Sequence, residues 1–171
     1  KNFTMKKLLC LLFVLTILGC SSNDDSNQTF RNIYSNTFWR VDGGVITFSN
    51  DKLFSLLDDD SNSMSCIYFK EGSYDNVDYD GCTYDNSLLS LIEETSDKLV
   101  FMQVTSNGTN NGSSSSCEGD DVTVTFEVLS DDLIRLTRSY DGVGDSLLMT
   151  KENSSFSFSG CVDGPSNGIL L

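Results

Sequence analysis

The sequence predicts an all-β fold, an antiparallel meander closed into a barrel of eight to nine strands. Short apolar runs alternate with clusters of Asn, Asp, Ser and Gly, and the run 122–128 alternates strictly between apolar and polar residues. No segment shows a sustained period of 3.6 residues, so little helix is expected. The expected strands are 38–41, 45–49, 53–57, 64–70, 88–93, 99–105, 122–128, 133–139 and 146–150.

The connections between these runs indicate tight hairpins. Segments 49–53, 95–99 and 130–133 each place small polar residues between two apolar runs. Such side chains hydrogen-bond the local backbone and tolerate unusual dihedral angles. Repeated hairpins give sequential antiparallel neighbours, and closure of the sheet removes its bare edges. Segment 106–116 contains no apolar residue and is expected to be a mobile loop.

The first residues are typical of an export signal. Lys6 and Lys7 precede an apolar stretch, 8–18, which matches the basic and hydrophobic regions of a secretory signal. Eleven residues at about 1.5 Å each span about 16 Å, roughly half of a bilayer's hydrocarbon core, so no membrane-spanning helix is expected. Residues 1–4 contribute nothing to this pattern and are interpreted as an over-long start.

The end of this stretch, Ile17-Leu18-Gly19-Cys20, resembles the lipobox of bacterial lipoproteins. The resemblance implies cleavage before Cys20 and a lipid anchor on its sulfur; the alternative is an ordinary cleaved signal. Ser21 follows the cysteine where an Asp would retain some lipoproteins at the inner membrane, so the outer membrane is expected. Residues 23–25, Asn-Asp-Asp, resemble short acidic signals that route lipoproteins to the cell surface.

Composition divides the chain into three parts. Residues 21–29 contain no apolar side chain and are expected to form a solvated tether. The predicted organisation is a signal peptide at 1–19, the lipidated cysteine and flexible tether at 20–35, and one β-barrel domain at 36–171. The protein is expected to be a monomer.

The charge composition excludes several classes of function. The chain has 25 acidic and 11 basic residues, a net charge of −14, and no histidine. Without histidine there is no Ser-His or Cys-His relay and no imidazole metal site. Nucleic acid is excluded as a partner because its phosphates require clustered Lys and Arg. The acidity either keeps the domain soluble near an anionic membrane or serves recognition of a basic partner.

Four cysteines remain after Cys10 in the signal and Cys20 are set aside. Cys66, Cys82, Cys117 and Cys161 are expected to form two disulfides in an exported domain. Three connectivities are open, and the local spacing favours Cys66–Cys82 with Cys117–Cys161. A zinc site is the alternative, but the usual C-x-x-C pairs are missing.

A family resemblance rests on three segments. Thr37-Phe38-Trp39-Arg40 stands where lipocalins open their first strand, residues 46–54 resemble the first hairpin, and residues 134–151 resemble the closing strands. The chain therefore resembles the lipocalin-like branch of the calycins over residues 36–151. The resemblance implies that a late-strand arginine, Arg138 or else Arg135, covers Trp39. It departs from the family at Thr37, where a glycine is usual.

The resemblance also implies an interior that is either filled or able to hold one small apolar ligand. Phe48, Phe54, Phe101 and Phe126 are the expected cavity-facing residues. The predicted function is that of a membrane-anchored lipoprotein, facing the periplasm or the cell surface, which binds such a ligand. The alternative is an acidic surface protein or inhibitor that engages a basic protein.

Catalytic and metal chemistry find little support in the sequence. No pair of carboxylates stands out for hydrolytic work, so no enzyme activity and no cofactor are expected. Asn76, Asp78 and Asp80 place oxygen ligands at alternate positions before Gly81, as calcium loops do. Ser87 stands where the bidentate glutamate of such a loop belongs, so no metal site is assigned.

Overall fold

The computed structural model describes residues 28–58, 65–79, 82–110 and 116–164. The predicted signal peptide and the anchor residue Cys20 lie outside the described residues, and so does Asp80 of the calcium candidate. Secondary structure in the described part is almost entirely strand, which confirms the predicted all-β class.

Thirteen strands and one short helix make up the described part of the chain. In chain order they are α2 (Phe30–Tyr34), β1 (Phe38–Val41), β2 (Gly44–Ser49), β3 (Lys52–Asp58), β4 (Ser65–Phe69), β5 (Gly72–Tyr79), β6 (Cys82–Glu94), β7 (Lys98–Thr105), β8 (Gly108–Asn110), β9 (Ser116–Cys117), β10 (Asp121–Ser130), β11 (Leu133–Tyr140), β12 (Val143–Glu152) and β13 (Val162–Asp163).

Strand β10 shows why these segments form strands. Val122, Val124 and Phe126 are at most 3% exposed, whereas the threonines between them are half-buried. β-Branched and aromatic residues at this spacing place one row of side chains in the core and the other on the outer face. β10 pairs with β7 on one side and with β11 on the other, both antiparallel.

The strands form one curled sheet whose order largely follows the chain. The order is β13-β4-β3-β2-β1-β12-β11-β10-β7-β6-β8-β9, with β5 also paired to β6. The predicted antiparallel arrangement of the long strands is therefore confirmed, and the last long strand returns to the first, since β12 pairs with β1.

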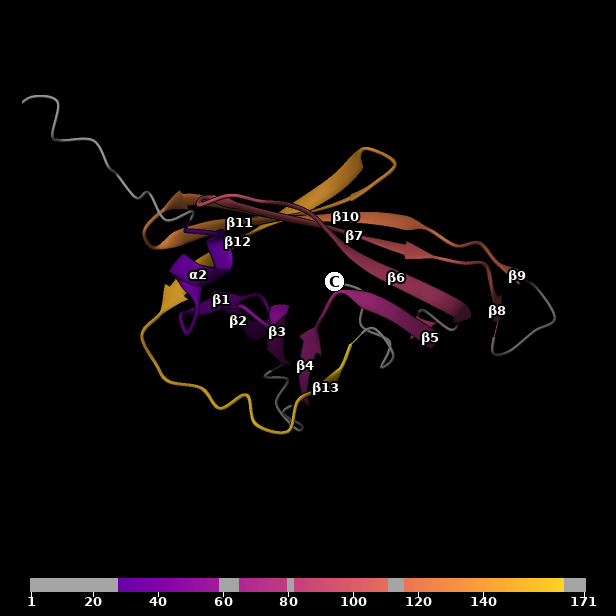
Figure 1. Ribbon diagram of the computed structural model, residues 1–171, viewed down its shortest axis with the longest axis horizontal. Helices are drawn as coiled ribbons and strands as arrows, with labels where there is room; N and C mark the ends of the chain where they lie inside the picture. Colours follow the sequence, from indigo (N-terminus) through magenta and orange to yellow (C-terminus); the bar gives the residue numbers. More distant parts are fainter. Residues whose placement is uncertain (1–27, 59–64, 80–81, 111–115, 165–171) are drawn as a thin grey trace, which may run out of the picture.

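The predicted closure into a barrel of eight to nine strands is wrong. Among the described residues, β4 and β5 follow each other in the chain without pairing, so the sheet is open there (Figure 1). The free edge of β4 instead takes up β13, which pairs in parallel through Val162 and Ile67. A C-terminal strand thus protects an edge that closure was expected to remove.

The main core fills the concave side of the curled sheet. Trp39, Phe54, Phe69 and Leu99 are no more than 2% exposed, and Phe30 of α2 is fully buried among them. The Phe30 ring lies 4.9 Å from the Phe48 ring in an edge-on contact. Residues 30–35, predicted to be part of the tether, belong to the folded domain, because burial of Phe30 holds this segment on the core.

The far end of the sheet contains strands that the sequence analysis missed. β8 lies inside the predicted loop 106–116 and β9 begins at its last residue; the two strands pair with each other, and β8 also pairs with β6 beyond the end of β7. A disulfide joins Cys82 to Cys117, and a small second core forms around Val77, Tyr84 and Cys117. Backbone pairing and the disulfide thus hold the described residues on either side of 111–115, which themselves lie outside the described part of the chain.

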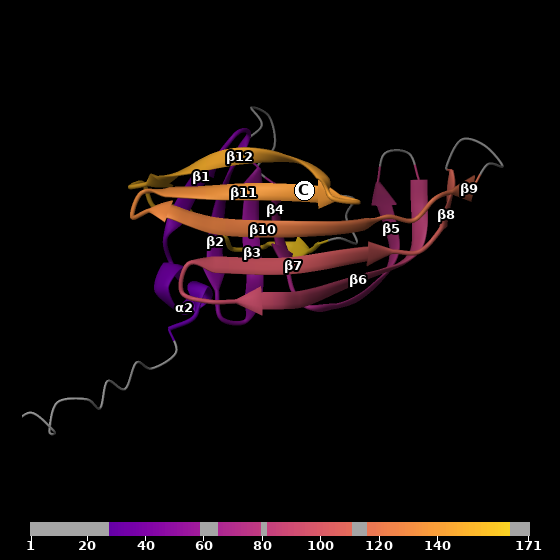
Figure 2. The ribbon, with the colours of Figure 1, turned by 90° about the horizontal axis from the view of Figure 1, so that it is seen from above.

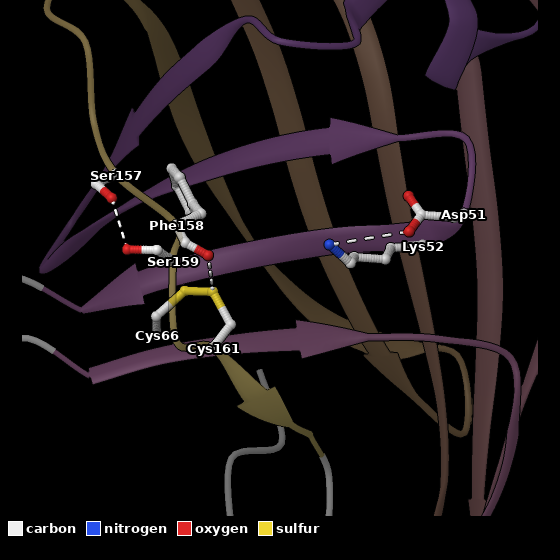
Figure 3. The surroundings of a disulfide bond; sticks show 7 residues. All are labelled: Asp51, Lys52, Cys66, Ser157, Phe158, Ser159 and Cys161. Carbon is white, nitrogen blue, oxygen red and sulfur yellow. Dashed lines mark hydrogen bonds and ion pairs between the residues drawn. A yellow bond between two sulfur atoms is a disulfide. The ribbon is translucent and has the colours of Figure 1, made fainter.

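Residues 153–164 form a C-terminal strap across the outer face of β1–β4. The ring of Phe38 on β1 lies 5.6 Å from that of Phe156 and 5.9 Å from that of Phe158. The second disulfide joins Cys66 on β4 to Cys161 in the strap (Figure 3). The favoured pairing, Cys66–Cys82 with Cys117–Cys161, is wrong because the strap and the β8–β9 segment each cross to a distant strand.

Candidate functional site

The four phenylalanines predicted to face a cavity pack against one another. Phe48 and Phe126 have ring centroids 5.1 Å apart, and Phe54 lies 5.5 Å from both Phe101 and Phe126. All four side chains are at most 2% exposed. The rings pack directly against one another. An apolar ligand bound here would have to displace them, and this would cost aromatic contacts within a close-packed core.

Trp39 is covered by a residue other than the predicted arginine. Its indole N–H donates to the Thr37 hydroxyl at 2.9 Å, and the Tyr34 ring lies edge-on at 5.8 Å. On β12, Trp39 faces Lys151 whereas Arg138 of β11 faces Asp145. Six strand residues separate those positions, about 20 Å along the sheet.

Both candidate arginines bond to acids on neighbouring strands. Arg138 contacts the two carboxylate oxygens of Asp145 at 2.6 and 3.2 Å, and Arg135 contacts Glu127 at 3.2 Å. The helix α2, which the family resemblance did not include, supplies the cover for Trp39 through Tyr34. The predicted arginine cover is therefore wrong for Arg138 and Arg135.

The calcium candidate lies at the end of β5. Asn76 adopts a left-handed backbone conformation (φ 55°) and is exposed, Asp78 belongs to the strand, and Asp80 is outside the described residues. Across the described part of the chain, no group of three or more Cys, Asp or Glu side chains is placed to hold a metal ion.

One ion pair fastens α2 to the end of β6. The Arg31 guanidinium contacts both carboxylate oxygens of Glu94, at 2.7 and 3.1 Å, and the Arg31 backbone N–H donates to the same carboxylate at 2.9 Å. The two side chains are only 14% and 9% exposed. Burial alone would raise the pKa of Glu94, but the bonds from Arg31 outweigh burial and lower it.

A shallow groove lies outside the packed interior. Its volume is about 270 Å³, and it runs between the start of β1 and the end of β12. The lining residues are Asn36, Thr37, Phe38, Lys151, Glu152, Asn153, Ser154 and Ser155. None of the four predicted ligand-binding phenylalanines borders it.

The strongest asymmetry of the molecule is electrostatic. We name as the acidic arm β5, residues 82–89 of β6, β8, β9 and residues 118–121, which lie together at the end of the molecule opposite α2 (Figures 1 and 2). Its described, exposed carboxylates are Asp75, Asp85, Glu118, Asp120 and Asp121. The arm contains no Lys and no Arg.

The cations of the described residues lie elsewhere and are mostly neutralised by acids. Six of them form ion pairs outside the arm, and these are Arg31, Arg40, Lys52, Lys98, Arg135 and Arg138. The negative charge of the arm is therefore uncompensated locally and projects into solvent.

The sequence contains a charge pattern that indicates the arm, although the predictions above did not include the arm. Residues 71–97 contain eight acids and no base, and residues 99–134 contain six acids and no base. A count of charge by segment would have located the asymmetry. It would not have shown that the two segments meet, because their contact depends on the pairing of β6 with β7 and β8.

No helix in the described part of the chain has the length and apolar character needed to span a membrane. Comparisons of the chain with protein-family models, with curated proteins and with solved structures found no match.

Proposed function

We propose that the protein is an exported lipoprotein, anchored through Cys20 to the outer membrane, whose domain binds a cationic protein partner through the acidic arm. The observation that carries the proposal is the concentration of exposed carboxylates at one end of the sheet, with no basic residue among them. This corresponds to the interaction function that the acidity of the chain suggested.

The anchor places the arm in a useful position. Nine residues separate Cys20 from Phe30, the first helical residue of the domain. Two or three acyl chains hold a protein on a membrane far more firmly than one chain does. The chain enters the domain at α2, and the arm lies at the opposite end of the domain (Figure 1).

The arm is suited to electrostatic recognition by its rigidity as well as its charge. The Cys82–Cys117 disulfide and the β5–β6 and β6–β8 ladders hold its carboxylates on an ordered scaffold. Fixed charges of one sign raise the rate at which an oppositely charged partner meets the surface, and a preorganised site loses little entropy on binding.

The packed interior supports a surface function over an interior one. Phe48, Phe54, Phe101 and Phe126 already contact each other, and their burial contributes to stability. A ligand that displaced them would have to replace that contribution before it gained any affinity.

The binding experiment compares two triple variants of the lipidated protein in nanodiscs of neutral lipid, with lysozyme as a cationic test protein. Asp85→Asn, Glu118→Gln and Asp121→Asn remove charge from the arm. Asp97→Asn, Asp131→Asn and Asp132→Asn remove three exposed charges from turns at the opposite end. We expect the arm variant to weaken binding at 50 mM NaCl by about tenfold, and the control by less than about twofold.

The same binding measurement is repeated at high salt. At about 0.5 M NaCl the Debye length falls to roughly 4 Å, so the difference between the two variants should disappear. Equal effects of both triple variants at low salt would show that only net charge matters, and would refute a role for the arm.

The anchor is tested separately by mass spectrometry. The mature chain should begin at Cys20 and carry the mass of its acyl chains, and Cys20→Ala should release the protein from the membrane fraction. A mature chain that lacks acyl mass would refute the lipoprotein part of the proposal and leave the acidic arm unaffected.

A further inference from the structure

The outer face of β6 and β7 carries an apolar patch beside the acidic arm. Leu89 and Leu91 point into the core, so Leu88 and Ser90 of β6 point outward. Leu88 faces Val104 across the ladder, and Ser90 faces Met102. Ile92 lies at the irregularity between Leu91 and Glu93. We call Leu88, Ile92, Met102 and Val104 the outer patch.

The patch is accessible. Leu88 is 45% exposed and Ile92 is 56% exposed, while Met102 and Val104 are half-buried. Figure 2 looks onto this side of the sheet, and no described helix or strand is drawn over β6 or β7. Apolar side chains that lie next to one another on an exposed sheet face are typical of a contact surface.

Acidic side chains border the patch on three sides. Asp121 of β10 is the cross-strand neighbour of Val104, and Glu93 follows Ile92 along β6. Asp75 of β5 faces Asn86, two residues before Leu88. Only Glu93 of these three carboxylates is held in an ion pair, with Lys98 at 2.9 Å. The patch is therefore an apolar centre with a negative rim that continues into the arm.

We propose that the outer patch is the contact centre for the partner of the acidic arm, and that this partner presents apolar side chains flanked by Lys or Arg. The proposal rests on the proposed function and adds to it the apolar half of the recognition. An apolar centre that excludes water strengthens the charge contacts at its rim and supplies affinity that salt does not remove.

The negative charge of the rim favours a cationic partner over a second copy of the chain and over an anionic lipid surface. A second copy of the chain seated on the same face would bring its own Asp75 and Asp121 against the same negative rim, and like charges repel. An anionic lipid surface would meet the same repulsion. A cationic amphipathic segment satisfies both the rim and the centre.

The test uses two peptides of equal length and charge with the lipidated protein in nanodiscs of neutral lipid. One peptide alternates lysine and leucine, and the other alternates lysine and serine. Leu88→Thr and Ile92→Thr, singly and together, remove apolar surface from exposed strand positions with residues that suit strands. Leu148→Thr is the matched control, because Leu148 is 59% exposed and lies on the distant strand β12.

We expect the double variant to weaken binding of the lysine–leucine peptide about tenfold and to leave the lysine–serine peptide unchanged. Leu148→Thr should change neither affinity. The arm variant with Asp85, Glu118 and Asp121 neutralised should weaken both peptides. Circular dichroism and the melting temperature of each single variant establish that the fold is retained. If the double variant is unstable, the binding measurement uses Ile92→Thr, at the most exposed position of the patch.

Three results would overturn the inference. Equal losses in the Leu88/Ile92 and Leu148 variants would show that the patch has no special role, while the acidic arm would still stand if its own variant weakened binding. Equal affinity for the two peptides would show that recognition is electrostatic alone. Concentration-dependent dimerisation that Leu88→Thr abolishes would assign the patch to a second copy of the chain.

Discussion

At the scale of single residues, the Arg31–Glu94 pair has the clearest energetic role. It links α2 to β6 across 63 residues of sequence, and Arg31 also donates to the Lys52 carbonyl at 3.3 Å. The pair thereby joins α2, whose Phe30 packs into the core, to two separate parts of the sheet. Its bidentate geometry and low exposure make it stronger than an ordinary surface pair.

Glu94→Gln should lower the free energy of unfolding at pH 7 by about 2 kcal/mol, because it leaves the partly buried guanidinium without its counter-charge. The pKa of Glu94 is lowered in the folded state, so its stabilising contribution is complete above the unfolded value of about 4.3 and is lost as pH falls through the folded value. Urea titrations of both proteins between pH 7 and pH 3 should therefore converge at the acid end. A difference that stays constant with pH would show that the lost contribution is not ionic.

Phe126→Ala should be among the most destabilising single changes. Phe126 is fully buried and contacts Phe48, Phe54 and Phe101. Loss of the ring leaves a cavity, and the expected cost is about 3–5 kcal/mol in urea unfolding. Leu148→Ala, at an exposed position, is the control and should cost under about 0.5 kcal/mol. A small loss for Phe126→Ala would mean that the interior can collapse or already holds space.

At the scale of elements, two short additions determine the shape of the sheet. The helix α2 contributes Phe30 to the main core and packs Tyr34 against it. The C-terminal strap covers the outer face of β1, and its strand β13 pairs with β4. The backbone of the strap approaches β4 closely at Gly164, where a Cβ would lie 2.6 Å from the Ile67 side chain. The strap thus uses the edge of β4 that barrel closure would have needed.

The disulfides should map to these two elements. Proteolysis without reduction, followed by mass spectrometry, should yield peptides that join Cys66 to Cys161 and Cys82 to Cys117. Replacing Cys66 and Cys161 by Ser should cost about 4–5 kcal/mol, because their bond closes 95 residues. Replacing Cys82 and Cys117 should mainly accelerate hydrogen exchange in β8 and β9. Equal acceleration throughout β10–β12 would contradict this local role.

At the scale of the whole molecule, charge is unevenly distributed. The net charge is −14, and the acidic arm carries carboxylates with no cation among them. Self-repulsion of this kind opposes the compact state and keeps copies of the molecule apart. The same negative charge that attracts a cationic partner therefore lowers the free energy of unfolding when no partner is bound.

Raising NaCl from about 0.02 to about 0.3 M should increase the melting temperature by roughly 2–4 °C, because screening weakens repulsion within the arm. The variant with Asp85, Glu118 and Asp121 neutralised should melt higher at low salt and respond less to added salt. A melting temperature that falls as salt rises would show that attractive ion pairs, such as Arg138–Asp145, outweigh the repulsion.

Local sequence patterns were sufficient to predict the β class, the antiparallel arrangement and most strands of the sheet. These follow from local physics: alternation in β10 chooses which side chains are buried, and polar turns such as the one between β10 and β11 reverse the chain. The candidate cavity residues lie in the interior, but the same alternation of apolar residues is compatible with a lined cavity and with the packed cluster that Phe48, Phe54, Phe101 and Phe126 form.

The open edge, the disulfide connectivity and the position of the acidic arm arise from long-range contacts in the folded chain. Each depends on segments distant in sequence: β13 reaches β4, Cys161 reaches Cys66, and β8 extends the ladder of β6 beyond β7. Local patterns carry no information about such pairings, because the free energy that selects them arises only when the distant segments meet and bury surface together.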